Sequence, residues 1–138
     1  MTTEMRRTAS EAMRALDSSV WIEHLTDGAL AERCGSYLIA EREVITPIQV
    51  LYEVYRWTLR HVGERAAMEV VGHMECTRLV PADAATAVAA VQLGADHGLA
   101  AADAMVYATA RLNRCELVTA DADFRGLPGV TLLERAAE

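Results

Sequence analysis

The 138-residue sequence contains no lysine, so its thirteen Lys/Arg residues are all arginine. A Walker A loop needs a lysine to hold nucleotide phosphates, and Schiff-base enzymes and S-x-x-K hydrolases need one for covalent chemistry. The absence of lysine therefore excludes these three kinds of site. The formal net charge of −7 also disfavours non-specific nucleic-acid binding over the whole surface, but it leaves a local site open.

Cysteine is scarce, because the chain has only Cys34, Cys76 and Cys115, and no C-x-x-C pair. Their odd number and wide spacing predict reduced thiols rather than a disulfide framework or a zinc ribbon. His73 and Cys76 are three residues apart, but two groups fall short of the three or four ligands that zinc takes from a protein.

Long apolar runs are missing as well, since Asp83, Asp96 and Asp103 interrupt the alanine-rich stretch. No run reaches the roughly 18 residues of a membrane-spanning helix. The first residues, MTTEMRRTASEAMRA, lack the apolar core of a signal peptide. We therefore expect a cytoplasmic protein without membrane contact. The length and the apolar content of 52% predict one domain over 13–138, preceded by an N-terminal extension over 1–12.

Short apolar segments alternate with segments of helical periodicity. We predict strands over 13–16, 44–45, 78–80, 116–119 and 130–133. We predict helices over about 18–27, 29–36, 47–62, 64–76, 83–97 and 100–113, with Thr46 as the cap of the third and Pro47 in its first turn. In that third helix, apolar residues recur at helical spacing: Ile48, Leu51, Tyr52, Tyr55 and Leu59. The alternation predicts an α/β fold with a parallel sheet of about five short strands flanked by helices.

Acidic residues stand at unusual places in this pattern. Asp17 comes directly after the first strand, Glu53 lies among apolar helix residues, and Asp103 lies in GLAAADAMVYATA. Asp121 and Asp123 follow the fourth strand in LVTADADF. In a parallel sheet, ligands bind outside the carboxyl ends of the strands, which is where Asp17 and Asp121 are expected.

An acid on a core-facing position costs several kcal/mol unless it is paired or binds a metal. With no lysine, a divalent ion explains the acids best, and oxygen ligands suit Mg²⁺ or Mn²⁺ rather than zinc. Such ions support phosphodiester cleavage, because they activate a water and stabilise charge on the phosphate. Each acid alone also has a structural explanation: Asp17 as a helix cap, Asp103 as a partner of a helix dipole, and Glu53 as a solvated residue.

Four segments, ALDSSVWIE, ITPIQVLYEVYR, GLAAADAMVYATA and LVTADADFRGLPGV, resemble in order and spacing the four acidic motifs of PIN-domain ribonucleases, and most of all the VapC-type toxins. The resemblance covers about 13–130. It implies that Asp17, Glu53, Asp103 and Asp121 are the catalytic, metal-binding acids. It further implies that Ser19 and Thr119 support them, and that Asp123 is a more variable acid near the metal.

The resemblance implies a three-layer fold, dependence on Mg²⁺ or Mn²⁺, and cleavage of a transfer, ribosomal or messenger RNA. It also implies a homodimer, and inhibition by a cognate VapB-type antitoxin at the active groove. Trp21, Leu25 and the apolar face over 48–55 are candidates to cover a groove for an antitoxin helix.

Three arginines are candidates to hold RNA phosphates. Arg56 and Arg60 share a helix face with Glu53, and Arg125 follows DADF. For Arg60, a solvated ion pair with Glu64 is an equally good explanation.

Two alternatives remain. A catalytically inert PIN fold would act only as a binding partner, but all four acids are present. A Mg²⁺-dependent phosphotransfer domain is disfavoured, because receiver domains need a late lysine and dehalogenase-like phosphatases need a second acid where Ser19 stands.

Overall fold

The computed structural model describes residues 13–134 of the chain. The predicted extension over 1–12 and the last residues of the predicted domain, 135–138, lie outside the described residues. The five strands are β1 (Arg14–Leu16), β2 (Val44–Pro47), β3 (Arg78–Val80), β4 (Glu116–Thr119) and β5 (Val130–Leu132). They form one sheet in the order β3-β2-β1-β4-β5, and every neighbouring pair is parallel. The predicted five-stranded parallel sheet is confirmed.

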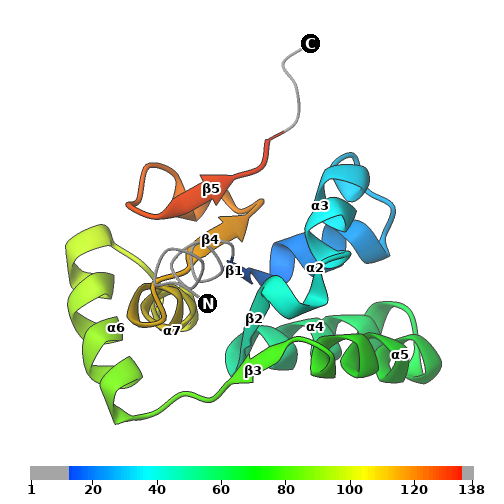
Figure 1. Cartoon of the computed structure of the whole chain (residues 1–138), viewed down its shortest axis with the longest axis horizontal. Coiled ribbons are helices and arrows are strands. Elements are labelled where there is room, and N and C mark those ends of the chain that lie inside the picture. Colours follow the sequence, from blue (N-terminus) through cyan, green and yellow to red (C-terminus); the bar gives the residue numbers. More distant parts are fainter. Residues whose placement is uncertain (1–12, 135–138) are drawn as a thin grey trace, which may run out of the picture.

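Six α-helices flank the sheet in the described part of the chain. They are α2 (Ser18–Leu25), α3 (Ala31–Leu38), α4 (Ile48–His61), α5 (Glu64–Glu75), α6 (Ala84–His97) and α7 (Ala101–Leu112). Two 3₁₀ turns, η1 (Glu41–Glu43) and η2 (Ala122–Phe124), precede β2 and follow β4. Figure 1 shows α6 and α7 on one side of the strands and α2 to α5 on the other, so the fold has the three layers predicted. Among the helices described, none is long and apolar enough to cross a membrane.

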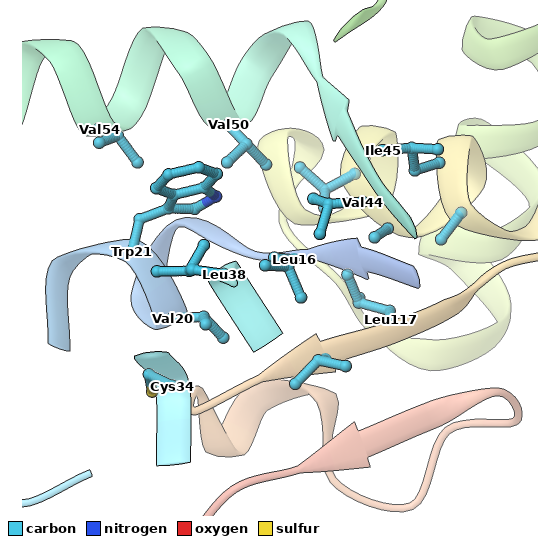
Figure 2. Packing of buried hydrophobic residues seen from close by; sticks show 14 of the residues in the cluster. Leu16, Val20, Trp21, Cys34, Leu38, Val44, Ile45, Val50, Val54 and Leu117 are labelled. Carbon is cyan, nitrogen blue, oxygen red and sulfur yellow. The ribbon is translucent and has the colours of Figure 1, made fainter. Parts of the chain in front are cut away.

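The core lies around the central strands β1 and β4 and under α2 and α4. Ala15, Leu16 and Leu117 are fully buried, as expected for parallel strands covered by helices on both faces. Trp21 of α2 is only 1% exposed and lies beside Val50 and Val54 of α4 (Figure 2). This burial overturns the suggestion that Trp21 covers an antitoxin groove, because its ring belongs to the core.

The beginning of α4 differs from the prediction. Thr46 does not cap the helix: it lies in β2, fully buried, and its hydroxyl is 2.6 Å from the hydroxyl of Thr77. Pro47 occupies the cap position, without a side-chain hydrogen bond to the helix. The strand extends to Pro47 because it pairs with β3, a long-range contact that the local Thr-Pro signal does not contain.

The buried face of α4 also differs from the apolar pattern of its sequence. The helix is confirmed, but its buried residues are Val50, Val54 and Thr58, whereas Ile48 and Tyr52 are exposed. Long apolar side chains therefore lie on the outer face of this helix, and Leu25 of α2 is exposed as well. They form a candidate contact surface rather than a part of the core.

Replacement of Leu117, which is fully buried in the central sheet, should test this core. We expect Leu117→Ala to lower the free energy of unfolding by about 2 to 5 kcal/mol, because it leaves a cavity among rigid neighbours. Leu112→Ala removes the same atoms from a side chain that is 51% exposed, and it should change stability by less than about 1 kcal/mol. Urea unfolding of both variants gives the two values, and equal losses would contradict this description of the core.

Candidate active site

Asp17 lies at the centre of the carboxyl edge of the sheet. It follows β1, and its backbone N–H still donates to the carbonyl of Val118 at 2.9 Å. The residue is only 4% exposed. Its Oδ2 atom accepts hydrogen bonds from the hydroxyl of Thr119 at 2.8 Å and from that of Ser19 at 3.0 Å. Two hydroxyls therefore fix the orientation of this carboxylate.

The same two hydroxyls hold the loop that follows β4. The backbone N–H of Ala120 donates to Ser19 Oγ at 2.9 Å, and that of Asp121 donates to Thr119 Oγ1 at 3.0 Å. Asp121 Oδ1 in turn accepts from the backbone N–H of Asp123 at 2.9 Å. The segment that carries the last two acids is thus attached to Asp17 through Ser19 and Thr119.

Glu53 reaches the site from α4, in the neighbouring βα unit. Its Oε2 accepts a hydrogen bond from Ser18 Oγ at 3.1 Å. Its Oε1 is buried and has no hydrogen-bond partner. Ser18 is the first residue of α2. Its contact with Glu53 joins residues 35 apart in the chain, and no local signal announces it.

Asp103 lies in the first turn of α7 and faces the loop after β4. One carboxylate oxygen from each of Asp103, Asp121 and Asp123 lies within 4.8 Å of the others. Helix α7 is held to the same loop, because the Tyr107 hydroxyl donates to the carbonyl of Pro128 at 2.6 Å. The structure therefore brings all five predicted acids to one edge of the sheet.

Burial and the closeness of the acids raise the pKa values of three of them. Burial, followed by the charges of Asp17 and Asp121, raises the pKa of Asp103 to about 6. Burial also raises the pKa of Asp17, against the hydrogen bonds from Thr119 and Ser19, and the pKa of Glu53, to which Asp17 contributes. No ion pair in the described chain links these acids to an arginine or a histidine. Within residues 13–134, the acids therefore repel one another without an ion pair to a cationic side chain.

The candidate RNA-binding arginines lie around this site in two settings. Arg56 and Arg60 are exposed on α4, one and two turns beyond Glu53. The alternative ion pair of Arg60 with Glu64 does not occur between these described residues. Arg125 forms an ion pair with Glu134 instead of facing solvent alone.

The donor set fits a divalent cation that prefers oxygen. The acids that converge here, among the residues described, offer carboxylate oxygens, and Mg²⁺, Mn²⁺ and Ca²⁺ take such oxygens. The buried, unpaired Oε1 of Glu53 points to the same conclusion, since an acceptor without a donor is costly unless a ligand satisfies it.

Comparison with known families agrees with this geometry. The sequence model of the PIN domain matches residues 14–130. The chain therefore belongs to the PIN-domain family, as its motifs suggest. No curated protein matches the sequence.

Solved structures share the fold at low sequence identity. A toxin–antitoxin complex from Klebsiella pneumoniae has a TM-score of 0.72 at 22% identity, over 86% of this chain and 95% of that chain. VapC20 from Mycobacterium tuberculosis, a sarcin-ricin loop cleaving toxin, has a TM-score of 0.71 at 20% identity, over 87% of this chain and 98% of that chain. A DNA-bound VapBC from Salmonella typhimurium has a TM-score of 0.68 at 16% identity, over 90% of this chain and 98% of that chain. The resemblance to VapC-type proteins thus extends to three dimensions.

Substitution of Asp103 should reveal the repulsion. Because the folded-state pKa is raised, protonation of Asp103 stabilises the fold below about pH 4, and this contribution is lost as the pH rises through about 6. We expect Asp103→Asn to raise the Tm of the metal-free protein at pH 7.5 by about 3 °C, corresponding to about 1 kcal/mol after allowance for solvent screening. At pH 4 the two proteins should have nearly the same Tm.

Thermal unfolding with a chelator present, measured from pH 4 to 7.5, gives this difference. Asp96→Asn is the control, because it removes one negative charge from the exposed part of α6. An equal gain in Tm for both variants at pH 7.5 would contradict a local repulsion at Asp103.

Proposed function

We propose that this chain is a divalent-metal-dependent endoribonuclease of the VapC toxin type. The observation that carries the proposal is the convergence of five acids at one sheet edge, with no ion pair to a cationic residue in the part of the chain that the structure describes: Asp17, Glu53, Asp103, Asp121 and Asp123. Mg²⁺ or Mn²⁺ is the proposed ion, since both take carboxylate oxygens.

A bound divalent ion activates water and stabilises charge on a scissile phosphate. The residues of the chain prepare the site for it. The hydroxyls of Ser19 and Thr119 fix Asp17, and Asp103, Asp121 and Asp123 supply oxygens from the other side. Because their positions are set by strand ends and by the first turn of α7, little reorganisation is needed when substrate binds.

RNA is the proposed substrate, with Arg56 and Arg60 as contacts to its phosphates. Both are exposed and lie beyond Glu53 on the same helix, so a strand crossing the acids would meet them. Arg125 can join them only if the substrate replaces Glu134 as its partner. The solved relative VapC20 cleaves the sarcin-ricin loop. For this chain, transfer, ribosomal and messenger RNA all remain open as targets.

A cognate VapB-type antitoxin is the proposed partner. Several structures with the same fold were solved as toxin–antitoxin complexes, including those from K. pneumoniae and S. typhimurium. Exposed apolar side chains of α2 and α4, namely Leu25, Ile48 and Tyr52, offer a surface for an apolar segment of such a partner. We further propose that the protein acts in the cytoplasm, where its RNA substrates are.

A homodimer is the proposed assembly, with α6 and α7 as its contact. A groove of about 480 Å³ lies between these helices and is lined almost entirely by apolar residues, among them Val91, Leu99 and Met105. Val88 and Val91 project from α6 and are 73% and 76% exposed. Apolar surface of this kind is typical of a contact between subunits.

The two alternatives are weaker. An inert PIN fold would not need to retain five repelling acids. A dehalogenase-like phosphotransfer site would need an acid at Ser19, whose hydroxyl instead donates to Asp17.

Loss of one acid should abolish activity without loss of the fold. We expect Asp103→Asn and Asp17→Asn to reduce RNA cleavage at least about 100-fold, because each removes a proposed metal ligand. Asp96→Asn should cleave like the wild type, and a chelator should stop the wild type until Mg²⁺ or Mn²⁺ is restored. Induced expression with mapping of new RNA 5′ ends, followed by cleavage of that RNA with purified protein, measures these effects. Equal cleavage by wild type and both acid variants would refute the proposal.

A charge on α6 should separate the proposed dimer. We expect Val91→Glu to give a monomer in light scattering after gel filtration, because the interface would bury an unpaired carboxylate. Gln92→Glu adds the same charge one residue later, and it should leave the dimer intact. A dimeric Val91→Glu protein, or a monomeric wild type, would show that this face is not the contact.

A further inference from the structure

Two acceptor oxygens without donors lie on consecutive turns of α4. Among the described residues, the buried side-chain atoms without a hydrogen-bond partner are Glu53 Oε1, Gln49 Oε1 and Trp21 Nε1. The Trp21 ring makes an edge contact with the ring of His73, with the centroids 5.3 Å apart. Gln49 has no comparable contact to explain why its carbonyl oxygen is buried.

The place of Gln49 in the fold relates it to the acids. Helix α4 begins at Ile48, directly after β2, so Gln49 lies in its first turn at the carboxyl edge of the sheet. It precedes Glu53 by four residues, and side chains at this spacing are neighbours on one helix face. Glu53 in turn interacts electrostatically with Asp17 and Asp121. Gln49 therefore occupies the same face as an acid of the site, one turn closer to the strands.

Gln49 Oε1 and Glu53 Oε1 are both hydrogen-bond acceptors, so they suit a ligand that carries hydrogen-bond donors. An unsatisfied buried polar atom is destabilising, so neither oxygen stabilises the protein in the absence of a donor. Mg²⁺ usually keeps several of its waters when it binds carboxylates, and each of those waters has hydrogens to donate. A neutral amide can accept from such a water without adding to the negative charge of the five acids.

We propose that Gln49 is a positioning residue, whose Oε1 accepts a hydrogen bond from a water carried by the divalent ion of the acidic site, beside Glu53. The inference depends on the proposed function for the presence of that ion. It adds a residue of the second acidic motif, ITPIQVLYEVYR, that is not one of the acids, and it assigns a role to the unpaired Oε1 of that residue.

Two measurements distinguish this role from simple packing: the Tm of the metal-free protein and the affinity for Mn²⁺. Gln49→Leu keeps the size of the side chain and removes the unpaired amide, so the Tm of the metal-free protein should stay equal or rise. The same variant should bind Mn²⁺ about tenfold more weakly, as for the loss of one hydrogen bond to a metal-bound water. Gln49→Glu keeps an acceptor, so its Mn²⁺ affinity should be at least that of the wild type, while its metal-free Tm falls through repulsion from Glu53.

The affinity is measured by electron paramagnetic resonance of free Mn²⁺ during titration, at pH 7.5, and the Tm by thermal unfolding with a chelator. Gln92→Leu, at an exposed glutamine of α6, is the control and should leave the Mn²⁺ affinity unchanged. Asp103→Asn reports on the acidic site itself and should bind Mn²⁺ weakly.

Each outcome decides between the possibilities. Wild-type Mn²⁺ affinity in Gln49→Leu, with weak binding in Asp103→Asn, would overturn the role of Gln49 and leave the proposed metal site standing. A lower metal-free Tm in Gln49→Leu, with weakened Mn²⁺ binding in Gln49→Glu as well, would make Gln49 a packing residue and overturn the inference. Absence of Mn²⁺ binding by the wild type would overturn both the inference and the proposed function.

Discussion

Mutual repulsion among carboxylates governs the arrangement of this protein. Five acids converge at one end of a small parallel sheet, and burial raises the pKa of Asp17, Glu53 and Asp103. Hydroxyl and backbone donors around Asp17 and Asp121 offset part of this cost, but the described arginines and histidines do not. The apolar strands β1 and β4 must therefore be buried well enough to tolerate a site that opposes folding. Such local instability is expected where a site is prepared for a ligand.

Much of this arrangement could be predicted from the sequence. The strand predicted over 116–119 agrees with the structure, and so do the helices predicted over 64–76 and 83–97, which begin after Gly63 and end before Gly98. Hydrophobic periodicity and glycine are local signals, so the sequence contains this information. The acids can be recognised as a set. Each alone has a structural explanation, as Asp103 has beside a helix dipole, but these explanations together do not account for acids at two strand ends and on two apolar helices. The parallel α/β pattern predicts that Asp17 and Asp121 lie at the carboxyl edge of the sheet. The structure adds the strand order, in which β1 and β4 are neighbours and bring these two acids together.

What the sequence could not supply depends on contacts between distant elements. Thr46 has the chemistry of a helix cap, yet pairing with β3 keeps it in the sheet. Ile48 and Tyr52 look like core residues, but α2 and its Trp21 pack against the other face of α4 and leave them exposed. Ser18 and Gln49 are ordinary polar residues at the beginning of helices. Only the tertiary structure shows that one holds Glu53 and that the other buries an oxygen without a partner.

The hydrogen bond from the Tyr107 hydroxyl to the Pro128 carbonyl groups the acids of the site into two sets. It joins α7, which carries Asp103, to the chain between β4 and β5, which carries Asp121 and Asp123. Glu53 and Ser18 belong to the opposite layer, where α2 packs against α4. Asp17 lies between these two sets of residues, because it follows β1 and accepts a hydrogen bond from Thr119 of β4. Asp103, Asp121 and Asp123 are therefore held together by the contacts of α7 with the loop after β4, and Glu53 is held separately by its contact with α2. Because α4 also contacts α7 directly, the packing of these two helices sets the spacing between Glu53 and the cluster of Asp103, Asp121 and Asp123.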